Sequence, residues 1–141
     1  MTNRVVITGM GGISSIGMSV PEIYNSMKEG KSGISMLEFP DVTRLNVRTG
    51  GQIKNFDPNK HFEQKQIGRM DRFSQFALLA ANEAITSSGL EDSREEWSEN
   101  AGIILGSSIG GIETINYSYK QVFEKGHNKL HPLTIPKIMN N

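Results

Sequence analysis

Cysteine is absent from this sequence of 141 residues. Without thiols the chain cannot form disulfides, bind zinc through thiolates or supply a thiol nucleophile. The three histidines, His61, His127 and His131, lack the spacing to carboxylates that a metal site needs. No pattern places a base beside a serine nucleophile either. We therefore expect surface histidines, no metal, no cofactor and no catalytic residue that the sequence alone can assign.

Apolar residues are scarce too, at 36% of the chain, with 7% aromatic residues and 15 glycines. The apolar run at residues 5–7 is too short for a secretory signal or a membrane span. Basic and acidic side chains cancel, 15 against 15, which argues against general adhesion to nucleic acid or membranes. We expect a soluble, cytoplasmic protein forming one modest domain, residues 1–141, with a thin core.

Two short aliphatic runs, at residues 4–8 and 101–105, predict buried strands. Each run is followed by a glycine-rich turn and then by a helical pattern. The first helix begins with a capping box at Ser19, and the second has apolar residues at helical spacing over residues 112–123. A strand, a turn and a helix in this order form the βα unit of an α/β fold.

The best helical pattern covers residues 70–88 and ends at Gly89. Four alanines on its apolar face favour close packing of another backbone against it. The region before it, residues 33–59, is irregular, and we expect only short strands there, near residues 45–47 and 51–56.

The glycine-rich turn after the first run, residues 9–17, is similar to a dinucleotide-binding fingerprint. Its register does not fit, because Ser14 stands where the third glycine belongs and the helix begins only near Pro21. We favour a tight structural turn and keep a nucleotide-binding α/β module as an alternative.

Charge is unevenly distributed along the chain. Residues 91–99 carry five acidic residues and one arginine, typical of a solvated connector. Basic residues prevail in residues 60–72 and again in residues 120–137. This asymmetry favours an acidic protein that docks on one side.

Five segments occur in an order and spacing that resemble a known family. They are RVVITGMGG at residues 4–12, GKSGI at 30–34, NFDP at 55–58, RMDRFSQFAL at 69–78 and GSSIGGIET at 106–114. Together they are similar to the N-terminal part of the β-ketoacyl-acyl carrier protein synthases, condensing enzymes of the thiolase fold. The resemblance implies an α/β, thiolase-like fold present as an incomplete N-terminal half, a mixed sheet with packed helices.

The resemblance also implies a function. These synthases transfer an acyl chain from acyl carrier protein to a cysteine, decarboxylate malonyl-acyl carrier protein at a site with two histidines, and join the two pieces by Claisen condensation. The family's cysteine and histidines lie beyond the position matched by Asn141, and none of this chain's histidines matches a catalytic position. We therefore expect a homodimeric acyltransferase of fatty acid or polyketide synthesis when intact, and no activity from this chain alone.

Three residues match family positions that bind other molecules, and a fourth, Ser108, departs from the family beside one of them. Ile109, in the GSSIGG loop (residues 106–111), matches a residue that lines the acyl pocket. Ser108 stands where glycine is common in that loop, and we expect it to alter loop mobility and chain-length preference. Lys65 and Arg69 match basic positions that meet acyl carrier protein. Ser15 also departs from the family, because proline is common at that position of the first turn.

The chain could also have a different origin or role. It could be a non-catalytic partner subunit that dimerises with a complete synthase or shapes its pocket. It could equally be a fragment or the product of an early stop, which we favour over a dedicated short protein.

Overall fold

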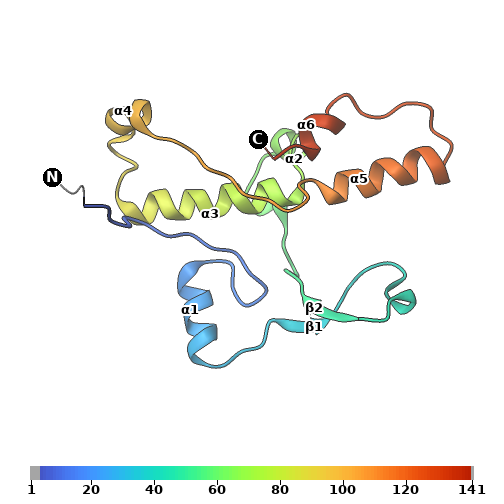
Figure 1. Ribbon diagram of the computed structural model, residues 1–141, viewed down its shortest axis with the longest axis horizontal. Coiled ribbons are helices and arrows are strands. Elements are labelled where there is room, and N and C mark those ends of the chain that lie inside the picture. Colours follow the sequence, from blue (N-terminus) through green and yellow to red (C-terminus); the bar gives the residue numbers. More distant parts are fainter. Residues whose placement is uncertain (1–3, 141) are drawn as a thin grey trace. The chain divides into compact units, whose positions relative to one another are not determined.

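The computed structural model describes residues 4–140, and these form two compact units. The longest helix is α3 (Arg72–Ser88), drawn in green and yellow in Figure 1. It contributes its first turns to one unit and the rest to the other. The first unit holds the described residues up to Phe56 together with Leu79–Glu96, and the second holds Asp57–Leu78 and the described residues from Trp97 onward.

The first unit contains the complete helix α1, a small sheet and part of α3. Its two strands pair in antiparallel fashion, with Ile34 opposite Gly51 and Met36 opposite Thr49. In chain order the elements are α1 (Val20–Lys28), β1 (Ile34–Met36), the 3₁₀ turn η1 (Val42–Arg44) and β2 (Thr49–Gly51); α4 (Arg94–Trp97) follows α3 and crosses into the second unit.

Helix α1 starts where the sequence predicts. Ser19 is its N-cap and its hydroxyl accepts a hydrogen bond from the Glu22 amide, at 3.4 Å. The Glu22 carboxylate reaches back to the amide of Met18, at 2.8 Å, one residue earlier than in an ideal capping box. Ser26, on the buried side, donates to the Ile16 carbonyl at 2.7 Å and ties the helix to the turn before it.

The glycine-rich segment before α1 lies directly against α3, as Figure 1 shows. A Cβ on Gly9 would collide with the Ala84 carbonyl oxygen, and one on Gly11 with that of Ala80. The Ser87 hydroxyl accepts a bond from the Met10 amide at 3.1 Å. The close packing predicted from the alanines of this helix is thus confirmed.

The second unit is built from short helices. Phe62 is its buried apolar side chain, at 9% exposure. The predicted helix over residues 112–123 is confirmed, although its last part is π-helical. The elements are the 3₁₀ turns η2 (Pro58–Lys60) and η3 (Ser98–Asn100), the helices α2 (Gln64–Ile67), α5 (Ile112–Tyr119) and α6 (Thr134–Ile138), the π-helical η4 (Lys120–Glu124), and the first turns of α3.

The predicted buried strands at residues 4–8 and 101–105 do not form within the described residues. Val5 is 91% exposed and Ile104 is fully exposed. A strand needs a neighbour for its backbone amides and carbonyls, and in the described part of the chain only β1 and β2 pair as strands. The strand predicted at residues 45–47 is also wrong, because that stretch follows η1 as a loop.

Within residues 4–140, no helix combines the length and the apolar character needed to cross a bilayer.

The contact of Gly11 with α3 gives a testable prediction. Gly11→Ala would place a methyl group against the Ala80 carbonyl and push the segment away from the helix. We expect a loss of about 1–3 kcal/mol in the free energy of unfolding, typical of overpacking, measured by urea unfolding. Gly102→Ala is the control, because its Cβ would enter open space; equal unfolding midpoints for the two variants would contradict the prediction.

Candidate functional site

The second unit brings two of the family-like segments together at a buried carboxylate. Asp71 precedes α3 and is 4% exposed. Its Oδ2 accepts hydrogen bonds from the Thr114 amide at 2.7 Å and from the Thr114 hydroxyl at 2.6 Å. Thr114 lies in the first turn of α5, where a negative charge also interacts favourably with the helix dipole. RMDRFSQFAL and GSSIGGIET therefore meet at this charge-assisted contact and at an ion pair between Arg72 and Glu113, at 3.8 Å.

The GSSIGG loop is held at its glycine end. The Gly110 amide donates to the Ser107 hydroxyl at 3.1 Å, and the Gly111 amide donates to the Ile138 carbonyl at 3.1 Å. Gly110 has a φ of +75°, a left-handed conformation that glycine adopts without strain. The loop thus makes a fixed turn into α5, alongside the chain segment that ends α6.

Ser108 and Ile109, the residues that the resemblance links to an acyl pocket, lie in the middle of this loop, before the bonded glycines. Ser108 is exposed, and Ile109 is 63% exposed. The role of Ile109 in lining an acyl pocket stays a prediction.

The two basic residues assigned to a protein partner share a short stretch of surface. Lys65 lies in α2 and Arg69 in the turn after it, where its amide donates to the Gln66 carbonyl at 2.9 Å. Both side chains are exposed, and within the described residues neither forms an ion pair with a carboxylate. Their charges are free to act on a binding partner.

The glycine-rich turn of the first unit has little capacity to bind phosphate. The Glu83 carboxylate already accepts bonds from the Gly12 amide at 2.9 Å and from the Val20 amide at 2.8 Å. A phosphate would need such amides for itself. This favours the structural turn over the nucleotide-binding alternative.

A hollow of about 250 Å³ lies nearby in the same unit. Its cation, Lys54, is paired with Glu38 at 2.8 Å and with the Met36 carbonyl at 2.8 Å, so it offers no free charge to an anion. The lining residues are Ser14, Ser15, Gly17, Met18, Ser32, Gly33, Ser35, Gln52, Ile53, Lys54 and Asn55.

Potential metal ligands are not gathered in the described part of the chain, where no group of three or more His, Asp or Glu side chains could hold an ion. His61, His127 and His131 are all exposed, as expected of surface histidines.

Sequence reasoning missed Asp71 and Glu83 as organising residues. It counted Asp71 only as part of a charged stretch and did not single out Glu83. A signal was present for Asp71: the helix over residues 112–123 begins after glycines that offer no capping side chain, so its first amides need an acceptor from elsewhere.

The NFDP segment leads into the 3₁₀ turn η2. The Asp57 carboxylate accepts bonds from the Asn59 amide and from the Asn59 side-chain amide, both at 3.0 Å, and so caps η2. The Asn59 side chain, followed by its backbone amide, lowers the pKa of Asp57 below its ordinary value.

Comparison with known proteins agrees with this arrangement of segments. A family model described as "Beta-ketoacyl synthase, N-terminal domain" matches residues 2–141. The 3-oxoacyl-[acyl-carrier-protein] synthase 2 of Staphylococcus aureus strain COL is 38% identical over 136 residues, which cover 96% of this chain and 33% of the relative. The chain therefore spans about one third of the length of the curated relatives that it matches.

Solved structures of ketosynthases are also similar to this chain. The ishigamide ketosynthase/chain length factor matches 95% of this chain and 33% of its own, with a TM-score of 0.76 and 25% identity. AntDE:AntF, described as a type II PKS acyl-carrier protein in complex with its ketosynthase, matches 99% of this chain and 37% of its own, with a TM-score of 0.67 and 21% identity.

The Asp57 cap gives a prediction about pH. Because the folded pKa is lowered, the cap stabilises η2 at neutral pH and is lost as the pH falls through that pKa. Asn59→Ala removes the largest contribution, so we expect the pKa of Asp57 to rise toward its ordinary value while the backbone bond keeps it from reaching it. NMR titration of the carboxyl carbon measures this, and an unchanged midpoint would show that Asn59 is not the cause.

Proposed function

Because the chain belongs to the β-ketoacyl synthase family, whose N-terminal domain model matches residues 2–141, we propose that it forms the N-terminal part of a condensing enzyme. The predicted α/β, thiolase-like fold is confirmed by the likeness to ketosynthase structures, over about one third of their length. The observation that carries the proposal is the convergence of two family-like segments at Asp71 and Thr114.

The reaction we propose for the intact enzyme is elongation of an acyl chain. An acyl thioester on a cysteine loses its thiolate as its carbonyl carbon bonds to the α-carbon of a malonyl group on acyl carrier protein. That carbon becomes nucleophilic as carbon dioxide leaves. This chain has no cysteine, so the nucleophile must come from sequence outside these 141 residues.

Within that enzyme we assign this chain a positioning and binding role. The GSSIGG loop presents Ile109 as one wall of the acyl pocket, where an apolar side chain excludes water from the alkyl chain. Ser108 beside it adjusts how the loop moves. Lys65 and Arg69 form the basic contact for acyl carrier protein.

Support for that partner comes from charge and from one structural neighbour. The exposed Lys65 and Arg69 provide positive charge on one short stretch, complementary to an acidic protein. The AntDE:AntF neighbour is a ketosynthase in complex with an acyl-carrier protein.

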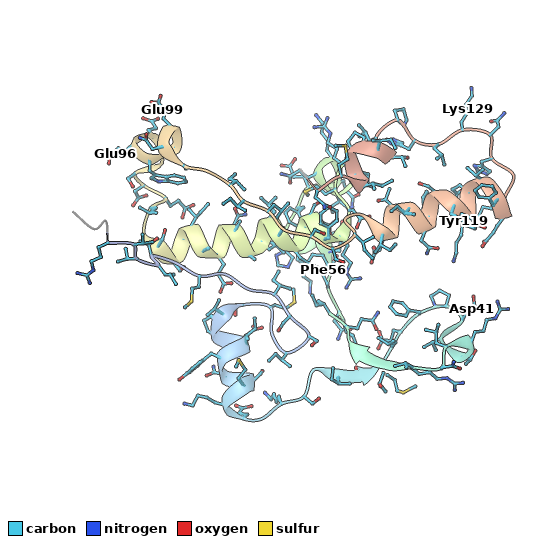
Figure 2. The ribbon with its side chains drawn as sticks, in the orientation of Figure 1. Asp41, Phe56, Glu96, Glu99, Tyr119 and Lys129 are labelled. Carbon is cyan, nitrogen blue, oxygen red and sulfur yellow. The ribbon has the colours of Figure 1, made fainter. Side chains whose placement is uncertain are left out.

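Charge reversal tests this contact. Lys65→Glu and Arg69→Glu should each weaken binding of acyl carrier protein by about threefold to tenfold, because exposed charges contribute modestly. Binding can be measured by calorimetry at low and high salt, and the salt dependence should fall in both variants. Arg44→Glu is the matched control, an exposed arginine of η1 that lies outside both basic stretches, 3.8 Å from the Asp41 carboxylate (Asp41 is labelled in Figure 2). An equal effect in all three variants would contradict the assignment.

An acyl-transfer assay tests the proposal that this chain binds and positions the substrate while another part of the enzyme carries the cysteine. With radiolabelled acyl-acyl carrier protein, this chain alone should take up no covalent label, since it has no cysteine. When it is produced together with a polypeptide carrying the remaining two thirds of a synthase, label should appear on that second polypeptide. Label on the present chain, or none on either, would show that the proposed function is wrong.

A second candidate function is a non-catalytic partner of a complete synthase. It is favoured by one structural neighbour, the ishigamide ketosynthase/chain length factor, in which a ketosynthase is paired with a chain length factor. A mixed dimer with a complete synthase, seen by cross-linking and intact mass, would support it. The homodimer expected from the resemblance and the cytoplasmic location expected from the composition stay predictions.

A further inference from the structure

Helix α5 depends on a cap from outside itself. Its N-cap residue, Gly111, has no side chain to accept a bond from the first-turn amides. A capping residue does not fit at that position, because a Cβ on Gly111 would lie 2.9 Å from the Ile138 Cα and 3.2 Å from the Asp71 Oδ2. The capping role therefore passes to Asp71, which is 43 residues away in the sequence.

The same carboxylate lies at the base of the GSSIGG loop. Asp71 Oδ2 holds Thr114, three residues after Gly111, and lies beside Gly111 itself. The other anchors are the neutral bonds from Gly110 to Ser107 and from Gly111 to Ile138, and an ion pair of Arg72 with Glu113 at 3.8 Å. That ion pair is long and its carboxylate is exposed, so it contributes little. A charged acceptor makes the stronger hydrogen bond, so Asp71 is the firmest of these fixed points.

We propose that Asp71 is a positioning residue for the GSSIGG loop, acting through Thr114, and that it thereby sets the acyl-chain length that Ile109 admits. The link to chain length rests on the proposed function; the link from Asp71 to the loop does not. A shift of the first turn of α5 carries the loop with it, because Gly111 belongs to both. Ser108 and Ile109 have no hydrogen-bonded anchor of their own among the contacts described above, so they follow that turn.

Backbone amide exchange of the 141-residue chain tests the link from Asp71 to the GSSIGG loop. In Asp71→Ala, exchange should become about tenfold faster or more at Thr114, as expected for loss of a bond to a charged group, and also faster at Gly110 and Gly111. Thr114→Val keeps the amide bond and loses the hydroxyl bond, so it should give a smaller increase at the same amides. It also keeps the test valid if the alanine variant does not fold.

Glu83→Gln is the matched control, since it weakens a carboxylate cap in the other unit. It should speed exchange at Gly12 and Val20 and leave Thr114 unchanged. If Asp71→Ala and Thr114→Val change exchange at Thr114 alone, the carboxylate is only a local cap and the proposal is wrong.

The link from the loop to acyl-chain length is tested in a complete synthase whose first 141 residues have this sequence. Asp71→Ala should change the ratio of kcat/KM for long and short acyl chains by about tenfold, the discrimination that a methylene or two gives in an apolar pocket. Asp71→Asn, which keeps an acceptor oxygen, should restore much of the original ratio. An equal loss of rate for every chain length would overturn the proposal. Absence of elongation by the unmutated synthase would instead overturn the proposed function, and the exchange experiment would still decide the role of Asp71.

Discussion

Two carboxylates associated with α3 hold the starts of two other helices. Glu83, within α3, accepts bonds from the Gly12 amide and from the first amide of α1, and Asp71, just before α3, holds the first turn of α5. In each case a glycine-rich turn precedes the helix. Amides at a helix start have no partner within the helix, and a carboxylate satisfies them with charge as well as with a hydrogen bond.

The two helix starts differ in how much they need the carboxylate as a cap. Helix α1 has its own cap, Ser19, so Glu83 adds to a start that is already satisfied. The N-cap of helix α5 is Gly111, whose close approach to the end of α6 leaves no room for a capping side chain. The carboxylate of Asp71 is therefore the more consequential of the two, and it is also the one next to residues that the family resemblance links to substrate.

Local signals made much of this structure predictable. The pattern from Ser19 onward gave α1, the alanine-rich face over residues 70–88 gave α3, and Gly89 ends that helix with a φ of +69°. Asp71 and Glu83 were missed because each bonds to residues 43 or more positions away, and spacing along a sequence does not reveal such pairs. The strands at residues 4–8 and 101–105 failed for a related reason, since pairing depends on a neighbour that the described residues do not supply.

The exposed runs and the thin apolar composition have a common physical cause under the proposed function. An aliphatic run such as residues 101–105, with Ile103 94% exposed, is costly to leave in water. Its composition fits a strand covered on both faces. Relatives with this fold are three times as long, so their remaining two thirds can provide both the covering layers and the hydrogen-bonding neighbours. The local elements of this chain form from caps and turns within it, whereas under the proposed function the runs at residues 4–8 and 101–105 become strands only when other sequence covers and pairs with them.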